Sequence, residues 1–413
     1  MHDMDHLALT NLLLIPPYHP KVYMYRNQPL ISIQENSHAA IYLHIPFCKQ
    51  ACHYCAFHFS TNLNLKSLVI KSMLKEIVLR QNDLQGMPIT SIYFGGGTPS
   101  LLSLSEIDQL LNQVVRYFPI APSAEVTLEA NPDDITLEKL QGWHHMGINR
   151  LSIGIQSFND TVLHYMNRAH TGAMAQRSIA WARTAGFNNL NIDLMYGLPV
   201  TTTQDWSADL KEVLLLAPEH ISAYCLTIKP KTVLSYWHQK GIMVEADETL
   251  TAEQFESAIE TFCNQGYVHY EISNFCKPEK YSRHNTNYWK SGLYIGIGPA
   301  AHGYNGSQRQ WNIDHNGRYV QAIQDGKLPH TEEILTIANH INEYIMTSIR
   351  TCWGCDFDWI YKKYAIDLMY IQKDYLNKII LWGLGHMNDH TLYLTNSGKL
   401  LADQIASDLF MED

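Results

Sequence analysis

Three cysteines lie close together near the start of the chain, with the spacing C-x3-C-x2-C: Cys48, Cys52 and Cys55. Thiolates this near in sequence must lie near one another in space, and soft sulfur ligands select zinc, copper(I) or an iron–sulfur cluster. A closed zinc site needs a fourth ligand, which zinc loops usually take from a second pair downstream. The local sequence contains no such pair. The spacing therefore favours a [4Fe–4S] cluster in which one iron has no protein ligand.

The elements that must position this loop are predicted from short apolar runs that alternate with amphipathic helical stretches, as in successive βα units. Strands are expected at residues 41–45, 91–94, 125–128, 151–155, 190–195 and 221–226. Helices are expected around residues 70–77 and at 106–118, 137–145, 173–185, 206–216 and 252–265. Six such units predict an α/β fold whose parallel sheet curls into a partial, TIM-like (β/α)6 barrel.

Glycines and polar residues follow these expected strands, at the end where barrels bind their ligands. The cysteine loop follows the first strand, and Gly96, Gly97 and Thr98 follow the second. The later strands end, in order, near Glu129, Gln156, Asp193 and Tyr224. A buried polar side chain without a partner is costly, so a polar ligand is expected at this edge. Glycine lets the backbone approach such a ligand closely, although a glycine triplet also occurs in plain tight turns.

The pattern changes after the barrel, which is expected to span residues 38–270. Residues 271–329 are expected to be a connecting segment, and residues 330–413 a smaller, mainly helical domain. That domain is predicted to hold helices at 332–348, 358–370, 371–382 and 398–410, with a short strand at 391–394. Residues 1–37 form an N-terminal extension without recognisable chemistry. They are either an ordered addition to the barrel or sequence upstream of the true start.

Composition narrows the class of protein. The chain is 46% apolar and 17% charged with a net charge of −10, which argues against binding nucleic acid by neutralising its phosphates. No run reaches the roughly 18 uncharged apolar residues of a membrane span. The N-terminus lacks the basic segment of a secretory signal. Eight cysteines in 413 residues, three of them clustered, suit a reducing compartment, so we expect a cytoplasmic globular protein.

The cysteine loop, with residues 42–47 before it, resembles the cluster loop of radical S-adenosylmethionine proteins. The strings around Glu129, Gln156, Arg168 and Asp193 (LEANP, SIGIQSF, NRAH and DLMYGLP) resemble the oxygen-independent coproporphyrinogen III oxidase family. The resemblance covers about residues 39–410. It implies that Cys48, Cys52 and Cys55 hold the cluster and that S-adenosylmethionine chelates the open iron. An electron from the cluster would then split the sulfonium and give a 5′-deoxyadenosyl radical, with a low-potential electron donor as a partner.

The same resemblance implies contacts to S-adenosylmethionine. The glycine run (Gly96, Gly97) and Thr98 would bind its amino group, and Arg168 has the fixed donor fork that suits its carboxylate. The remaining contacts, to the ribose, the adenine and the methionine part, are implied for Tyr42, Tyr54 through its backbone, Glu129, Gln156 and Asp193. The plain alternative is that each of these is a structural polar residue.

Two features separate branches of the family. The decarboxylating oxidases carry a fourth cysteine two residues after the third, and this chain has Phe57 there. Residues 284–289 read H-N-x-x-Y-W, a feature of the haem-chaperone (HemW-like) branch, which implies haem binding by His284, Tyr288 and Trp289. Imidazole is a common haem ligand, and aromatic rings can flank a flat macrocycle. Alternatively, His284 and Asn285 stabilise a turn while another residue ligates the iron.

The resemblance therefore implies a haem chaperone with a [4Fe–4S] cluster and S-adenosylmethionine, and leaves catalytic residues unassigned. It also implies haem-requiring acceptors, membrane proteins among them, and a homodimer linked through the cluster. One rival is the enzyme that anaerobically oxidises two propionates of coproporphyrinogen III to vinyl groups. The other is a zinc-stabilised binding module. Cys352 and Cys355 form a C-x-x-C pair with no partner pair nearby, so we interpret them as incidental thiols rather than a redox or zinc motif.

Overall fold

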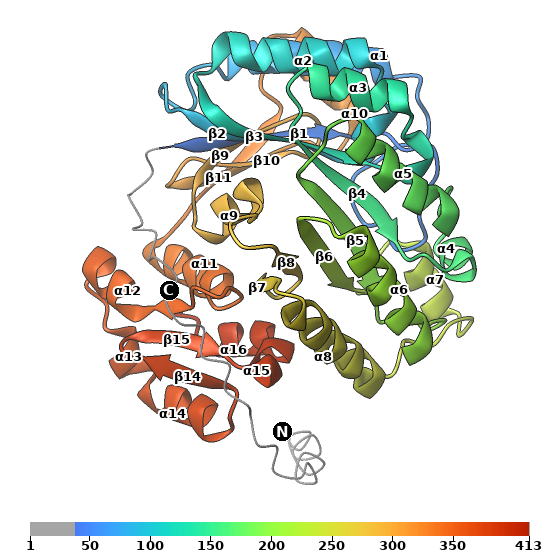
Figure 1. The fold of residues 1–413 in the computed structure, drawn as a ribbon. Helices are drawn as coiled ribbons and strands as arrows, with labels where there is room; N and C mark the ends of the chain where they lie inside the picture. Colours follow the sequence, from blue (N-terminus) through green and yellow to red (C-terminus); the bar gives the residue numbers. More distant parts are fainter. Residues whose placement is uncertain (1–37, 413) are drawn as a thin grey trace. The chain divides into compact units, whose positions relative to one another are not determined.

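A sheet of twelve strands organises residues 38–412, the part of the chain that this computed structural model describes (Figure 1). Six of its strands follow in sequence order and run parallel. They are β1 (Ala39–Ile45), β2 (Ile89–Gly96), β3 (Ile120–Ala130), β4 (Arg150–Gln156), β5 (Leu190–Tyr196) and β6 (His220–Cys225). This confirms the predicted α/β fold built on a parallel sheet. The predicted extension at residues 1–37 lies outside the described residues.

Helices join these strands and cover the outer face of the sheet (Figure 1). The predicted ones are α1 (Lys66–Leu79), α2 (Leu104–Tyr117), α3 (Leu137–His145), α5 (Gly172–Thr184), α6 (Thr203–Leu216) and α8 (Glu248–Asn264). The short helices α4 (Asp160–Tyr165) and α7 (Val233–Gln239), and the 3-10 turns η2 (Pro99–Leu101) and η3 (Pro132–Asp134), were not predicted. Local sequence fixes several helix starts, as where Ser103 and Glu106 form a capping box at α2.

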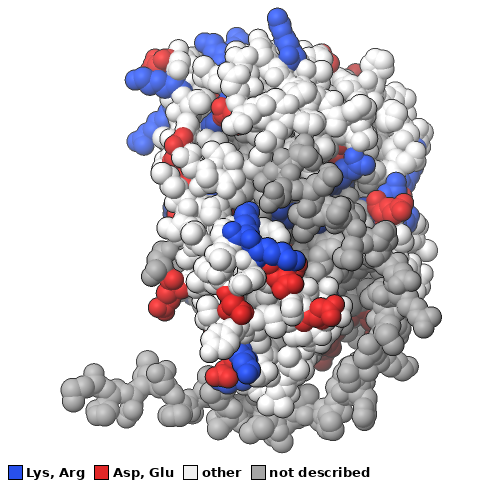
Figure 2. Space-filling view, turned by 90° about the vertical axis from the view of Figure 1, so that its left-hand side faces the viewer, with Lys and Arg blue, Asp and Glu red and all other residues white. Residues whose placement is uncertain are grey.

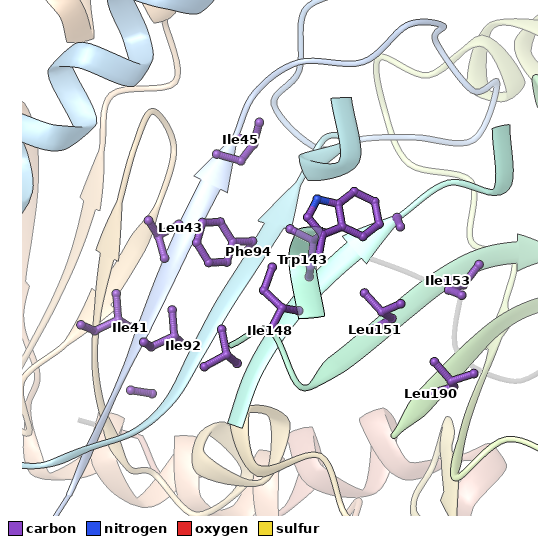
Figure 3. Close-up of a cluster of buried hydrophobic side chains, with 14 of the residues drawn as sticks. Ile41, Leu43, Ile45, Ile92, Phe94, Trp143, Ile148, Leu151, Ile153 and Leu190 are labelled. Atoms are coloured by element: carbon purple, nitrogen blue, oxygen red, sulfur yellow. The ribbon is translucent and has the colours of Figure 1, made fainter. Parts of the chain in front are cut away.

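The main core lies between the sheet and these helices. Figure 3 shows Ile41, Leu43 and Ile45 of β1 beside Phe94 of β2, and all four are fully buried. Burying one such side chain stabilises the fold by about 1.5–3 kcal/mol. Because successive side chains of a strand point to opposite faces, the intervening residues of β1 face the other side of the sheet. That side carries the candidate site.

The sheet continues beyond both ends of the six parallel strands. β9 (Leu293–Ile297) pairs parallel with the free side of β1, and β10 (His302–Tyr304), β11 (Gln308–Asn312) and β12 (His330–Ile334) follow antiparallel. At the other end, β8 (Asn274–Cys276) and β7 (Val268–Glu271) follow β6. The segment expected to be a connection thus supplies strands to the main sheet, and also α9 (Arg283–Trp289) and α10 (Asn316–Gln324). The domain boundaries stay a prediction.

The C-terminal part is mainly helical, as predicted. Its helices are α11 (Ile337–Ser348), α12 (Phe357–Tyr364), α13 (Leu368–Ile371), α14 (Lys373–Leu381), α15 (Asn396–Leu400) and α16 (Ala402–Asp408). A small antiparallel sheet joins β13 (Cys355–Asp356), β15 (Thr391–Leu394) and β14 (Gly385–Asn388). Of the helices within residues 38–412, none has the length and apolarity needed to cross a bilayer.

Three helix predictions in this part were wrong in extent. The helix expected at 332–348 begins only at Ile337, because residues 330–334 pair with β11 and Thr336 forms a capping box with Asn339. The helix expected at 358–370 is two helices, separated where Ala365 takes a left-handed conformation with φ 57°. The final helix expected at 398–410 is likewise divided, into α15 and α16.

Charged side chains are distributed without one dominant sign on the face drawn in Figure 2. Basic and acidic groups stand there in small, interspersed clusters among uncharged residues. One buried ion pair links elements of the fold. Arg80 donates from Nε to Glu76 at 2.8 Å, and both side chains are buried. Asn312 donates to the same Glu76 carboxylate at 2.7 Å, so this pair ties α1 to β11.

Candidate cofactor site

The cysteine loop leaves the C-terminal end of β1 and is held against the glycine run that follows β2. The backbone N–H of Gly97 donates to the carbonyl of Ile45 at 2.9 Å, and that of Thr98 donates to the carbonyl of Phe47 at 2.8 Å. Two neighbouring parallel strands therefore fix the loop at its root. This is the strand end at which the sequence predicted the site.

The three thiols of the loop influence one another. Burial, together with the charges of Cys55 and Cys52, raises the pKa of Cys48 to about 11, while a hydrogen bond with Thr98 acts the other way. Burial also raises the pKa of Cys55. Iron must therefore displace protons from these thiols when it binds. Among residues 38–412, no three His, Cys, Asp or Glu side chains converge on a position for a single metal ion. A four-iron cluster makes a different demand, because each thiolate bonds to its own iron.

The glycine run packs too closely for any side chain. A Cβ on Gly96 would lie 2.6 Å from the His44 ring, and one on Gly97 would lie 2.8 Å from the backbone oxygens of Ile45 and Phe47. Gly96 also has a φ of 107°, which L-residues rarely adopt. Gly96 is therefore required by the His44 ring of β1, and Gly97 by the backbone at the root of the cysteine loop. Their predicted contact with a bound ligand stays a prediction.

Arg168 joins the cysteine loop to the ends of β3 and β4. Its Nη2 donates to Asn131 Oδ1 at 2.7 Å and to the Gly154 carbonyl at 2.6 Å, and its Nη1 donates to the Cys52 sulfur at 3.4 Å. The Tyr54 hydroxyl lies 3.5 Å from the same Nη1. Nε of Arg168 is buried and has no hydrogen-bond partner within residues 38–412. Because the Arg168 guanidinium is held in place and its buried Nε–H has no acceptor within residues 38–412, this position suits an anionic ligand.

Gln156 lies beside Arg168 at the end of β4. A Cβ on Gly154 would be 3.1 Å from the Gln156 amide nitrogen and 3.3 Å from Arg168 Nη2, so both side chains lie over this glycine. Gln156 is buried and has a φ of 70°, in the left-handed region. Such strain in a residue other than glycine is kept only where the surrounding structure enforces it, and it gathers at ligand sites.

Two carboxylates lie near one another, Glu129 at the end of β3 and Asp193 in the middle of β5, although the sequence placed Asp193 at a strand end. Tyr93 donates to Glu129 Oε1 at 2.8 Å, and burial raises the pKa of Glu129 to about 7, with the Tyr93 hydrogen bond acting the other way. Asp193 accepts from Asn191 at 2.6 Å and from Ser152 at 3.2 Å, and burial raises its pKa too. The charge of Asp193 contributes to the raised pKa of Glu129, so the two carboxylates share one region.

Tyr42 completes this group of predicted residues. Its hydroxyl lies 3.1 Å from His44 Nδ1, and its ring lies 6.1 Å from that of Tyr93. Burial raises the pKa of Tyr42 well above its usual value, and Glu129 raises it further. The predicted residues therefore lie as two adjoining sets: one around Arg168 and the cysteines, the other around Glu129. Tyr93 and Asn131 were not predicted, although both stand in the strand-end segments that the sequence marked.

His284, from the predicted haem motif, is in the interior instead of on a free surface. It lies on α9, is 1% exposed, and stacks on Tyr93 with ring centroids 4.8 Å apart. Its Nδ1 lies 2.9 Å from Ser91 Oγ, and its Nε2 lies 2.8 Å from the Tyr288 hydroxyl. Burial and the charge of Arg150 lower its pKa to about 3. Both ring nitrogens are thus occupied, as in the alternative in which His284 stabilises its own segment.

The other motif residues lie in different surroundings. The Arg350 guanidinium stands 6.0 Å from the centre of the Trp289 ring, and the Trp289 Nε1 is buried without a hydrogen-bond partner in the described chain. Tyr288, by contrast, reaches a cavity of about 640 Å³, which neither His284 nor Trp289 lines. Phe57, in the place of the fourth cysteine, lies on the wall of that cavity.

Comparison with known proteins identifies the family. Residues 42–213 match the family model described as the radical SAM superfamily. The Bacillus subtilis protein "Heme chaperone HemW" is 34% identical over 370 residues, which are 88% of this chain and 97% of that protein. The chain belongs to the HemW family of radical SAM proteins. An Escherichia coli protein of the same name is 37% identical over 272 residues, 64% of this chain and 69% of that protein.

A solved structure shares the fold of this HemW-family chain. The coproporphyrinogen III oxidase (HemN) of Escherichia coli, titled a radical SAM enzyme, superposes with a TM-score of 0.78 and covers 90% of each chain. At 23% sequence identity this match shows the fold alone. The predicted family and fold class are both confirmed.

Proposed function

We propose that this protein is a haem chaperone, which binds haem and delivers it to haem-requiring proteins. The observation that carries the proposal is its similarity, over 97% of the Bacillus subtilis protein, to a relative named as a haem chaperone. Phe57, 72% exposed in the place of a fourth cysteine, offers no thiol for the decarboxylating reaction. The rival function is that of the oxidase, which has the same fold. A shared fold does not favour the oxidase over the chaperone.

The proposed function includes a [4Fe–4S] cluster. Cys48, Cys52 and Cys55 supply three sulfur ligands and leave one iron open. When bound, the cluster supplies low-potential electrons to the sulfonium of S-adenosylmethionine. The chain's own part is to hold the loop: the backbone of Gly97 and Thr98 fixes its root, and Arg168 places positive charge beside the sulfur of Cys52.

S-adenosylmethionine is proposed to lie across the two sets of residues. The Arg168 guanidinium, held by Asn131 and Gly154, receives the carboxylate. Its Nε, which has no hydrogen-bond partner among residues 38–412, is an available donor. Glu129 accepts hydrogen bonds from the ribose hydroxyls and attracts the sulfonium. The remaining contacts come from Tyr42, Tyr54, Gly96, Gly97, Thr98, Gln156 and Asp193.

The affinity for S-adenosylmethionine is expected to fall in acid because Glu129 must be ionised to accept these hydrogen bonds. Burial raises its pKa to about 7, so the carboxyl gains a proton as the pH falls through that value. Affinity should drop about tenfold per pH unit below about pH 7. Equilibrium binding at several pH values, on cluster-loaded protein, measures this.

The matched variant is Glu129→Gln, which keeps the size of the side chain but cannot ionise. It should bind more weakly at about pH 8 and lose the pH dependence near pH 7. A wild-type affinity that is constant from about pH 6 to pH 8 would contradict the assigned role of Glu129.

The chaperone proposal is tested by adding haem to anaerobically reconstituted protein and recording optical spectra. We expect saturation near one haem per chain, followed by transfer of that haem to an apo haem protein. Protein that binds no haem would overturn the proposal. Release of carbon dioxide from coproporphyrinogen III, under reductant and S-adenosylmethionine, would instead establish the oxidase.

The partners follow from this function. Haem acceptors, membrane proteins among them, and a low-potential electron donor are proposed, together with a homodimer linked through the cluster. The reducing cytoplasm is the proposed compartment, since the chain has eight cysteines and all of them are free thiols in the structure.

A further inference from the structure

Residues 165–168, which follow α4, contact the cysteine loop at several successive positions. Gln50 donates from Nε2 to the backbone carbonyl of Asn167 at 2.9 Å and to its Oδ1 at 2.8 Å. Asn167 in turn donates from Nδ2 to the Ala51 carbonyl at 2.7 Å, and it has a φ of 56°, in the left-handed region. Such a conformation in a residue other than glycine is kept where the surrounding structure enforces it. The loop therefore has a second support besides the glycine run.

His53, between the second and third cysteines, joins this segment to α7. Its backbone N–H donates to the Met166 carbonyl at 3.1 Å, and its own carbonyl accepts from the Leu234 N–H at 3.1 Å. Its ring Nδ1 lies 2.7 Å from the Tyr165 carbonyl. Because a carbonyl oxygen can only accept, Nδ1 carries a proton in this contact and donates it. One residue of the loop thus connects the segments that follow β4 and β6.

Aromatic rings pack together at this connection. The His53 ring meets the Trp237 ring of α7 edge-on, with ring centroids 4.7 Å apart, and the Tyr165 ring lies 5.8 Å from that of Trp237. Helices α4 and α7 therefore lie beside one another (Figure 1). Trp237 is partly buried, whereas its neighbours Tyr236 and His238 are exposed. Tilted aromatic pairs at such distances stabilise a fold beyond the area that they bury, so these rings hold α7 against the loop.

The part of the loop between Cys52 and Cys55 needs support from outside. It contains no helix or strand of its own, so its shape depends on contacts from other segments. Thiolates can hold a cluster only if the backbone that carries them keeps its shape, and removing the groups that orient metal ligands weakens metal binding. His53 makes three hydrogen bonds from this short stretch.

We propose that His53 is a positioning residue for the iron–sulfur cluster, and that together with Trp237 it fixes the stretch between Cys52 and Cys55 and limits the access of water to it. The inference rests on the cluster of the proposed function. It goes beyond that function because it assigns retention of the cluster to contacts from α4 and α7. His53 acts here through the backbone of the loop and not as a ligand.

The first test measures how fast a chelator removes iron from anaerobically reconstituted protein. His53→Ala should lose iron about three- to tenfold faster than wild type, because a hydrogen bond contributes a factor of that size. His53→Asn should lie closer to wild type, since its amide can still donate to the Tyr165 carbonyl. His164→Ala removes an exposed imidazole of α4 and should lose iron at the wild-type rate.

The second test measures the midpoint potential of the cluster in Trp237→Ala. This variant leaves the hydrogen bonds of His53 in place but removes the ring that packs against it, so water gains access. Reduction adds negative charge, which water stabilises, so the midpoint potential should rise. Trp382→Ala removes the same kind of ring at the end of α14, where it is 59% exposed, and should leave the potential unchanged.

The third test uses hydrogen exchange in the cluster-free protein, so that iron plays no part. The peptide that contains residues 48–55 should exchange faster in His53→Ala than in wild type, because its amides open more often. Peptides from residues 337–408 should exchange as in wild type. Thermal unfolding of each variant shows whether it is folded, and if His53→Ala is not, His53→Asn and Trp237→Ala carry the comparison.

The outcomes separate this inference from the proposed function. Wild-type protein that takes up no iron and sulfide would remove the cluster, and the role of His53 with it. If wild type holds the cluster but His53→Ala loses iron and exchanges hydrogen at the wild-type rates, the positioning role is wrong while the cluster stands. An unchanged potential in Trp237→Ala would overturn the part assigned to that ring.

Discussion

Replacing Cys52 by alanine is expected to abolish the iron–sulfur cluster. Wild-type protein reconstituted without oxygen should hold about four iron and four sulfide per chain, and the variant close to none. Only three cysteines serve the cluster, so the loss of one leaves two irons without a protein ligand. Iron and sulfide analysis, with the visible absorption spectrum, measures the effect.

The matched control is Cys225→Ala. This thiol is exposed at the end of β6 and outside the cysteine loop, so its removal should leave iron and sulfide unchanged. Zinc in wild-type protein without iron or sulfide would contradict the cluster. The C-x-x-C pair can be tested in the same way. Burial raises the pKa of Cys352 to about 11 and that of Cys355 to about 12, so both thiols are protonated at neutral pH.

Arg168→Met is expected to weaken binding of S-adenosylmethionine by about 30-fold or more. Removing one member of a desolvated, hydrogen-bonded charge pair costs about 2–5 kcal/mol, and methionine keeps the length of the side chain without its charge. The variant would also lose the guanidinium donors that Asn131 and Gly154 hold in place. Equilibrium binding to cluster-loaded protein gives the affinity, after iron analysis has shown equal cluster content.

Arg177→Met is the control for this experiment. Arg177 lies on the exposed side of α5, with its guanidinium 5.2 Å from the centre of the Trp181 ring. The change removes the same charge from the protein but leaves the barrel mouth intact. The affinity for S-adenosylmethionine should therefore equal that of wild type. Wild-type affinity in Arg168→Met would remove Arg168 from the proposed binding site.

The strand ends of the barrel were predictable from the sequence because two physical rules agree there. Apolar runs of strand length alternate with helical periodicity, and ligands of parallel sheets lie at the carboxyl ends of strands. Glu129 and Gln156 lie at the ends of β3 and β4, as those rules require, whereas Asp193 lies in the middle of β5. Their roles in binding go beyond these rules and remain predictions.

Other features depend on contacts that no local pattern contains. Residues 330–334 are polar enough to continue a helix, and only pairing with β11 makes them a strand. The left-handed turn at Ala365 could not be predicted, because no glycine stands at that position in the sequence. His284 stood out as a motif residue, but its two ring nitrogens contact Ser91, far away in the chain, and Tyr288.

The position of β1 has a consequence for how the chain is made. This strand lies inside the sheet, yet one of its two neighbours, β9, begins at Leu293. At about 5–20 residues per second, a ribosome needs roughly 12–50 s to reach β9 after it has finished β1. During that interval the backbone of β1 is an unpaired edge, open to other chains. The native partner for this side of β1 is therefore made only when the last third of the sequence is translated.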